Sequence, residues 1–495
     1  MGGAGASTIS TVRGILSAAG YVPYRRLDRA EVSRFFGNGG GKGTRAVASH
    51  DEDTSTLGVE AARLALRSAP ELSPEALWFS TANPAYLDKT NATVLHAALR
   101  LSSTVPAFDF GGALRSGIGA LQTALTNRGT VMVVAADARN GLATSADESI
   151  GGDAAAAIVV GDSGAGGEVI AEWVGSGSAT DEFLDRWRLP GEQRSKLWEE
   201  RFGENRYLDL GREAWERALK EVGLTGNDID QVVISGMHTR ANKGLARHLG
   251  LRDGALRDDL AATVGQAGVA HPALLLAAAL EDESAAHNDV GSDRIIAVVH
   301  LADGADVLLF RTTRALASFR PARTVATQIE HGGRVAYGKF LSWRKMVDVE
   351  PPRRPEPQRV SSSAAWRSEA WKFGFVGSRD RSSGAVHLPP ARVSMKGGAT
   401  DDMEPLPMAD ARGTVVTFTV DRMVFSPSPP VIFAVVDFDG GGRFPVELTD
   451  LDDGVLAIGD RVEMTFRRLF TADGIHDYFW KAKPLTTAGE GGSAQ

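Results

Sequence analysis

The chain has 495 residues and not one cysteine. Disulfides, thiolate zinc sites, iron–sulfur clusters and cysteine nucleophiles are therefore all excluded. Positive charge is also in short supply, because 54 Lys and Arg face 62 Asp and Glu and leave a formal net charge of −8. Such a balance gives no electrostatic attraction to nucleic acid or to an anionic membrane, so we expect neither as a partner.

Long apolar stretches are missing as well. No run approaches the roughly 18 consecutive apolar residues of a membrane-spanning helix. The first ten residues, MGGAGASTIS, lack the basic and apolar regions of a signal peptide. These features predict a cytoplasmic protein. The length is about three times that of a typical domain of roughly 150 residues, so we expect two or three separate cores.

Strand-length apolar runs alternate with helix-length, alanine-rich segments through most of the chain. This alternation is typical of a layered α/β fold around a buried sheet. The sequence predicts helices over 53–67 and 116–126, where apolar residues recur with a helical period, and a buried strand over 130–136. Two strand–turn–strand segments, at 130–162 and 294–313, resemble each other, which predicts two packed halves of similar build.

The composition changes towards the C-terminus. Residues 347–370 carry four prolines among Arg, Glu and Ser, a pattern that predicts an extended linker. Short β-branched runs punctuated by Gly, Pro and Asp follow, and they predict a small antiparallel barrel. Residues 401–485 contain 15 acidic and 8 basic residues. Nucleic-acid binding by this barrel is therefore not expected.

Four segments, in this order along the chain, carry a family resemblance: RGILSAAGYVPYRRLDRAEV, GTRAVASHDEDTSTLGVEAAR, FDFGGALRSGIGALQTAL and YGKFLSWRK. They resemble archaeal and bacterial hydroxymethylglutaryl-CoA synthases, members of the thiolase and ketoacyl-synthase-III superfamily, over about residues 12–346. The resemblance implies an internally duplicated, five-layer thiolase fold of the α/β class, a homodimer and acyl-CoA substrates. It implies no cofactor beyond the coenzyme A thioester itself.

A second resemblance covers residues 372–398 and the barrel after them. They resemble the zinc ribbon and OB-fold module that accompanies thiolase-like acyl-CoA enzymes. In that module two pairs of cysteines bind zinc, and the matching positions here are Asp380, Ser383, Ser394 and Gly397. These residues cannot supply tetrahedral nitrogen and sulfur ligands, so we predict no metal. Packing must then hold the ribbon, and the candidate anchors are Trp366, Trp371, Phe373 and Phe375.

The two resemblances divide the chain into six segments. The expected boundaries are 1–165 and 166–346 for two thiolase-like halves, 347–370 for a Pro-rich linker, 371–398 for a degenerate zinc ribbon, 399–485 for the OB-fold and 486–495 for a disordered tail. The first two segments carry the synthase-like motifs, so we expect the functional site there.

The nucleophile of the resembled synthases is a cysteine at a strand-to-helix elbow, where it takes the acyl group as a thioester. The elbow is present here as DFGGALRSG and keeps Gly112, but Leu114 stands at the cysteine position. An isobutyl group has no lone pair and no ionisable proton, so no acyl-enzyme can form there. Ser116 lies further along the expected helix and should point elsewhere. The family's general-base glutamate, expected within residues 80–83, is missing too.

Two further positions match catalytic residues of the superfamily. His238 follows an apolar strand and matches a histidine that hydrogen-bonds the substrate's thioester carbonyl, although a structural strand-end histidine fits equally well. Gln266 stands in the turn that matches a catalytic asparagine, and it keeps an amide donor. Substrate contacts are expected from Asn83, Tyr86, Gly112 and His271. His271 begins a helix, so a purely structural role stays open for it.

Two functions are open at this point. The first is an acyl-CoA-handling, synthase-like subunit without its own nucleophile, which docks with a thiolase or aldolase while the barrel helps to pass the pantetheine arm. The second is an aldolase or retro-aldolase that acts on β-hydroxyacyl-CoA without a covalent intermediate, with His238, His271 or Tyr86 as its base. Removal of cysteines by engineering is a weaker alternative, because Ser or Ala replaces Cys more closely than Leu does.

Overall fold

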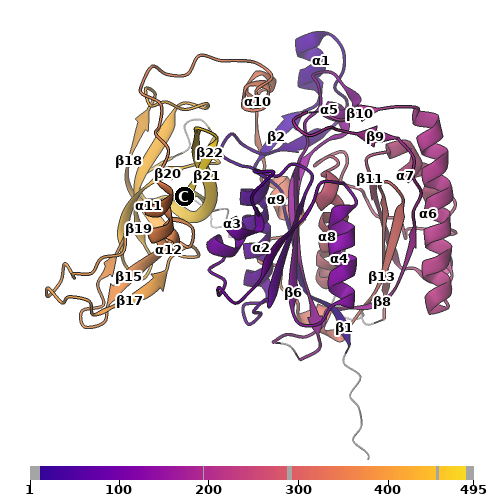
Figure 1. The fold of residues 1–495 in the computed structure, drawn as a ribbon, viewed down its shortest axis with the longest axis horizontal. Coiled ribbons are helices and arrows are strands. Elements are labelled where there is room, and N and C mark those ends of the chain that lie inside the picture. Colours follow the sequence, from indigo (N-terminus) through magenta and orange to yellow (C-terminus); the bar gives the residue numbers. More distant parts are fainter. Residues whose placement is uncertain (1–11, 165, 193, 287–292, 453–455, 486–495) are drawn as a thin grey trace, which may run out of the picture.

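The computed structural model describes residues 12–164, 166–192, 194–286, 293–452 and 456–485. The tail expected at 486–495 lies outside the described residues. Figure 1 shows an α/β body, coloured indigo to pink, beside a smaller β-barrel in orange and yellow. No helix within the described ranges is both long enough and apolar enough to cross a bilayer.

A nine-stranded sheet organises the α/β body. Its order is β11-β12-β13-β8-β1-β7-β6-β4-β5. The strands are β1 (Arg13–Tyr21), β4 (Ala76–Thr81), β5 (Ala107–Gly111), β6 (Val131–Ala138), β7 (Asp153–Asp162), β8 (Ala171–Ala179), β11 (Gln231–Gly236), β12 (Ile295–Leu301) and β13 (Ala305–Thr312). Only two residue pairs join β1 to β8, so this short ladder links two otherwise separate half-sheets.

The two half-sheets repeat the same pattern of strand directions. β4 and β6 are parallel, and β7 and β1 then follow in antiparallel order. β11 and β12 are likewise parallel, and β13 and β8 follow in antiparallel order. The two segments that resemble each other in sequence, 130–162 and 294–313, are the antiparallel pairs at corresponding places. This repetition confirms the predicted internal duplication.

Three pairs of helices complete five layers (Figure 1). These pairs are α2 (Thr54–Ser68) with α3 (Ala92–Ala98), α4 (Ser116–Thr126) with α8 (His271–Ala285), and α6 (Glu200–Val222) with α7 (Thr239–Ala246). β6 shows how the layers form, because alternate side chains of a strand point to opposite faces. Met132 and Val134 pack in the core under α2, whereas Val131 and Val133 pack with α4 and α8. The five-layer arrangement expected from the family resemblance is confirmed.

Helix α2 begins where the sequence predicts. The Asp53 carboxylate accepts a hydrogen bond from the Thr56 amide at 3.0 Å, and the Thr56 hydroxyl oxygen accepts one from the Asp53 amide at 2.9 Å. This reciprocal capping box satisfies amides that the first helical turn leaves free. The remaining elements of the body are β2 (Arg25–Asp28), α1 (Ala30–Phe36), β3 (Thr44–Val47), α5 (Ala146–Ile150), β9 (Arg186–Trp187), β10 (Lys196–Leu197), α9 (Val325–Glu330), β14 (Gly333–Arg334) and α10 (Tyr337–Trp343).

A closed five-stranded barrel follows, in the order β18-β19-β20-β22-β21. Its strands are β18 (Arg412–Asp421), β19 (Val431–Phe438), β20 (Arg443–Leu448), β21 (Arg461–Ala472) and β22 (Ile475–Pro484). Before it come helices α11 (Ser362–Arg367) and α12 (Glu369–Lys372) and a small sheet of β15 (Val376–Asp380), β16 (Val386–His387) and β17 (Met403–Pro407). The expected extended linker therefore contains a short helix.

Three of the four predicted aromatic anchors pack against the barrel. Ring centroids of Trp371 and Phe444 lie 5.0 Å apart, those of Phe375 and Phe438 5.8 Å, and those of Phe373 and Phe466 6.1 Å. The prediction is wrong for Trp366, which is 74% exposed because α11 buries none of its residues.

Three of the four positions that match zinc ligands, Asp380, Ser383 and Ser394, form a hydrogen-bonded cluster. The Ser383 hydroxyl donates to Asp380 Oδ2 at 2.5 Å, and the Ser382 amide donates to Asp380 Oδ1 at 2.9 Å. Hydrogen bonds from Ser383 and Ser394 hold the pKa of Asp380 well below its ordinary value. A carboxylate that receives several hydroxyl and amide hydrogens thus connects the two turns. Within the described ranges, no three His, Asp or Glu side chains are grouped to hold a metal ion.

The barrel docks on the N-terminal half of the body. In β21 the Phe466 amide donates to Glu60 of α2 at 3.0 Å, and the Arg468 amide donates to the Asp51 carbonyl at 2.8 Å. Arg63 of α2 donates in return to the Met464 carbonyl at 3.1 Å. Backbone groups of β21 are therefore bound directly by the body.

Buried ion pairs cross the same seam. Arg467 is fully buried and donates to Glu52 of the body and, at 2.5 Å, to Asp450 of the barrel. Lys481 lies 3.0 Å from Asp51, and both side chains are buried. Because a buried charge without a partner is costly, these pairs fix how the barrel sits on the body.

One buried carboxyl in the central layer should make stability depend on pH. Glu281 of α8 accepts a hydrogen bond from the Val325 amide at 2.7 Å, and burial raises its pKa to about 8. The folded state therefore holds a proton that the unfolded chain releases near pH 4.5, so this group's contribution to stability is complete below that pH and is lost as the pH rises through 8.

Glu281→Gln removes that ionisation and keeps an acceptor for the Val325 amide. Between pH 6 and pH 8 the free energy of unfolding of the wild type should fall by about 2 kcal/mol more than that of the variant. Urea unfolding at the two pH values measures this difference. Parallel pH profiles of the two proteins would contradict this assignment.

Candidate functional site

A pocket of about 1020 Å³ opens at the carboxyl ends of five strands. Residues directly after β4, β5 and β6 line it from one half, and residues directly after β11 and β12 line it from the other. Open α/β sheets bind ligands at this end of their strands. Residues 185–192, the end of α10 and one barrel side chain, Arg468, complete the wall. The pocket thus lies where both halves and the barrel meet.

Leu114 lies in the wall of this pocket, at the elbow between β5 and α4. Gly112, also in the wall, has a φ of +95°, a backbone conformation that favours glycine. The Leu114 side chain is partly buried and packs against a core cluster that includes Val264 and Val269. Ser116 does not line the pocket, and its hydroxyl donates to the Gly111 carbonyl at 3.0 Å. The elbow therefore presents Leu114, and not the Ser116 hydroxyl, to the pocket.

His238 lines the pocket, but both of its ring nitrogens are engaged. Nδ1 accepts a hydrogen bond from the Ala241 amide at 3.1 Å and so caps α7. Nε2 lies 3.0 Å from the Glu200 carbonyl oxygen, so it carries the proton and donates it. This pairing describes a neutral, structurally satisfied histidine, and a contact with substrate would have to replace one of the two bonds.

Gln266 and His271 lie behind the wall rather than in it. Gln266 is 1% exposed, and its side-chain amide has no hydrogen-bond partner among the described residues. His271 Nδ1 accepts from the Ala267 amide at 3.3 Å, and burial lowers its pKa to about 3. Neither residue lines the pocket.

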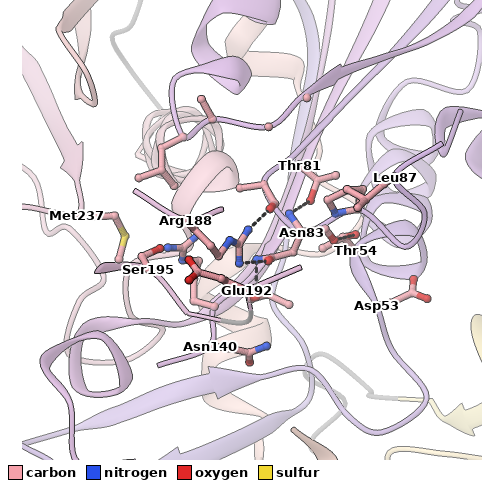
Figure 2. A pocket seen from close by; sticks show the side chains of 18 of the residues that line it. Asp53, Thr54, Thr81, Asn83, Leu87, Asn140, Arg188, Glu192, Ser195 and Met237 are labelled. Carbon is pink, nitrogen blue, oxygen red and sulfur yellow. Dashed lines mark hydrogen bonds between the residues drawn. The ribbon is translucent and has the colours of Figure 1, made fainter. Parts of the chain in front are cut away.

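Asn83 and Tyr86, two predicted substrate contacts, line the pocket. Figure 2 shows Arg188 reaching from the opposite wall to Asn83, whose Oδ1 accepts its hydrogen bond at 2.6 Å. Asn83 Nδ2 in turn donates to Asp137 at 2.7 Å. The Tyr86 hydroxyl accepts a hydrogen bond from the His476 amide of the barrel at 2.7 Å. Tyr86 therefore ties the pocket to the barrel.

Sequence reasoning missed three acid–base groups in the same pocket: Asp185, Tyr207 and Asp303. Asp185 is 5% exposed, and Asp303 lies in the turn between β12 and β13. Burial and the charge of Asp185 raise the pKa values of both Tyr207 and Asp303. The one sequence signal was the Asp-Gly turn between two apolar strands, which fits a hairpin just as well.

Arg468 is the barrel's own contribution to the wall. Its Nη2 donates to the His50 carbonyl at 2.9 Å, and its Nη1 lies 3.6 Å from Asp53. Beside it, burial raises the pKa of Glu52 to about 7. Glu52, Asp53 and Arg468 therefore place mixed charge where the barrel meets the pocket.

A family model described as the ChsH2 C-terminal OB-fold domain matches residues 407–467. This match covers the end of β17 and most of the barrel, up to the middle of β21. The barrel is therefore an OB-fold, as the sequence predicts.

Solved structures share the fold of the body. A structure of MvaS in complex with 3-hydroxy-3-methylglutaryl coenzyme A superposes with a TM-score of 0.57, over 71% of this chain and 95% of that one, at 18% identity. 3-Oxoacyl-(acyl carrier protein) synthase III, FabH, from Pseudomonas aeruginosa PAO1 gives a TM-score of 0.52 over 61% of this chain and 98% of its own, at 17% identity.

Similarity in sequence identifies the family more specifically than similarity in fold. The hydroxymethylglutaryl-CoA synthase of Thermococcus onnurineus (strain NA1) is 31% identical over 247 residues, which span 48% of this chain and 70% of the relative. The match, the five-layer fold and the pocket at the elbow all agree with the resemblance found in the four sequence segments. The chain belongs to the hydroxymethylglutaryl-CoA synthase family.

Proposed function

We propose that this chain is an acyl-CoA-handling subunit that forms no acyl-enzyme and acts with a thiolase or aldolase partner in forming or cleaving a carbon–carbon bond. The observation that carries the proposal is Leu114, which places hydrocarbon at the elbow of an otherwise well-formed pocket. Family membership supports an acyl-CoA condensing function, and the missing nucleophile argues that the covalent step takes place elsewhere.

The pocket wall suits a coenzyme A thioester. Arg188, Lys345 and Arg468 bring cations from three different parts of the chain. Coenzyme A is polyanionic, and phosphates bind Arg and Lys through charge-assisted hydrogen bonds. The barrel would hold the pantetheine arm at the seam, where Tyr86 and Arg468 already connect it to the body. The chain would then need no cofactor besides its substrate.

The open edge of the sheet supports a protein partner. Within the described residues β5 pairs only with β4, so its other side offers free backbone groups. Phe108 on this strand is 55% exposed. Exposed edge strands readily pair with another chain. This edge suits the expected homodimer and also a thiolase-like subunit of the same fold.

A second function is favoured by a separate observation. Asp185, Tyr207 and Asp303 give the pocket acid–base groups that need no thiol. The chain would then be an aldolase or retro-aldolase on β-hydroxyacyl-CoA in its own right.

The two functions are separated by assays on the purified chain. We expect radiolabelled acetyl-CoA to bind reversibly, no label to survive denaturation, and carbon–carbon bond turnover to require an added thiolase that co-purifies with the tagged chain. Turnover of β-hydroxyacyl-CoA by the chain alone would instead establish the second function. A label that survives denaturation would overturn the proposal.

A further inference from the structure

We infer that Asp303 is the general acid–base residue of this pocket, and that it accepts the β-hydroxyl proton of a β-hydroxyacyl thioester when the bond between the α and β carbons breaks. The inference rests on the second proposed function, in which the chain itself forms or cleaves the carbon–carbon bond of an acyl-CoA bound in the pocket. Its chemistry needs no thiol, no metal and no oxidant, so a chain without cysteine can carry it out.

The proposed step balances in atoms and electrons. The Asp303 carboxylate takes the hydroxyl proton, the bond between the two carbons breaks, and the β carbon leaves as a carbonyl compound. The bonding electrons pass to the thioester, which becomes an enolate. Protonated Asp303 then returns the proton to the α carbon, and a shorter acyl-CoA is released. In the reverse direction the same carboxylate removes an α proton.

The position of Asp303 fits this role. It lies with Leu301 and Ala302 in the wall that also contains Leu114. Arg115, the residue after Leu114, donates from Nη1 to the Asp303 carbonyl at 3.0 Å and so fastens the hairpin turn to the elbow. An acyl group bound at the elbow would therefore lie near the turn that carries Asp303.

Asp303 and Gly304 form the turn between β12 and β13, with φ values of +45° and +135°. Asp followed by Gly is a favoured pair in hairpin turns that need positive φ. Asp473 and Gly474 make a turn with positive φ values between β21 and β22 in the same way. The hairpin turn therefore explains the backbone conformation of Asp303.

The Asp303 side chain is exposed at the mouth of the pocket and only partly desolvated, so its carboxylate can exchange protons. Among the described residues it makes no hydrogen bond and no ion pair within 4 Å, while the Asp303 amide donates to the Tyr207 hydroxyl at 3.4 Å. The charged groups facing it are Asp185, Glu182, Arg115 and Arg186. Burial and the Asp185 charge raise the Asp303 pKa, which makes its carboxylate a stronger base.

The other candidate bases are engaged or lie outside the pocket. The Asp185 carboxylate and the Tyr207 hydroxyl are hydrogen-bonded to each other. Both ring nitrogens of His238 are engaged with backbone groups. His271 lies behind the wall, and Tyr86 binds the barrel through its hydroxyl. Asp303 is the candidate whose proton-accepting atoms are unpaired and open to the pocket.

Exchange of the α protons of acetyl-CoA in D₂O, followed by NMR with the full-length chain, tests this role. We expect Asp303→Asn to slow exchange by at least about 100-fold, the usual scale for loss of a general base. Asparagine tolerates a positive φ, so the fold should persist, and calorimetric titration should give a dissociation constant for acetyl-CoA within about twofold of the wild type. Asp303→Gly also removes the carboxylate and fits the positive φ, so it should lose exchange equally.

A second variant, at Asp185, tests the role of Asp303 through the pH dependence of exchange. A purely structural role of Asp303 would leave this pH dependence unchanged. Asp185→Asn removes the nearest negative charge, so the pH midpoint of exchange should move to lower pH. Wild-type exchange rates in Asp303→Asn would overturn the assignment. So would a wild-type chain that binds acetyl-CoA without exchanging its protons. A chain that binds no acetyl-CoA would instead overturn the proposed function itself.

Discussion

Replacing Leu114 by cysteine is expected to turn a chain that takes up no acyl group into one that carries one acetyl group per molecule after incubation with acetyl-CoA. Position 114 lies in the pocket wall, two residues before α4 begins. A thiol just before a helix N-terminus has a lowered pKa, and its thiolate is a strong nucleophile. Because the chain contains no other cysteine, any thioester must sit at position 114.

Intact-mass spectrometry measures the adduct, and release by hydroxylamine identifies it as a thioester. Leu114→Ser is the matched control, since its hydroxyl has a similar size but is a weak nucleophile without an adjacent base. The serine variant and the wild type should stay unlabelled. If the cysteine variant binds acetyl-CoA yet reacts neither with it nor with iodoacetamide, the side chain at position 114 does not face the substrate.

Replacing Arg467 by methionine is expected to lower the free energy of unfolding by about 3–5 kcal/mol, because Glu52 and Asp450 then stay buried without their cation. All three side chains are at most 4% exposed, so water cannot take over the lost hydrogen bonds. Chemical denaturation measures the loss. Hydrogen exchange should place the earliest opening at β21 and at the loop before α2, where the barrel meets the body.

Arg461→Ala is the matched control in the same strand. Arg461 pairs with Asp439, but both side chains are at least 41% exposed, so its removal should cost less than about 1 kcal/mol. Adding Glu52→Gln to Arg467→Met should recover part of the loss, since one unpaired charge disappears. Equal effects of Arg461→Ala and Arg467→Met would refute the idea that burial decides the cost.

The fold could be predicted because the sequence patterns that indicate its helices and strands are local and recur along the chain. Asp53 and Thr56 mark the start of α2 within four residues of sequence, and 130–136 is too apolar for anything but a buried strand. The family segments supplied the layer order. Trp366 shows where such reasoning fails, because an aromatic residue near a predicted core can still lie on a helix that buries nothing.

Site residues could be predicted only where a single sequence segment determines whether they reach the pocket. Leu114, Gly112, Asn83 and Tyr86 lie in the loops that follow β4 and β5, and all four line the pocket. Gln266 lies just before α8 and His271 begins it, and neither residue lines the pocket, a difference of depth that sequence spacing does not reveal. Asp185 and Asp303 come from distant parts of the chain, and only the folded sheet places them together.

Arg468 and Tyr86 join the OB-fold to the pocket. Ligand binding in the pocket and docking of the barrel on the body are therefore thermodynamically coupled. Thermodynamic reciprocity requires that a thioester which binds better to the docked form must also tighten the docking. By the same rule, a partner protein that weakened the contact between barrel and body would favour release of the bound thioester. Under the proposed function, a partner that separated the barrel from the body would therefore weaken the binding of a coenzyme A thioester.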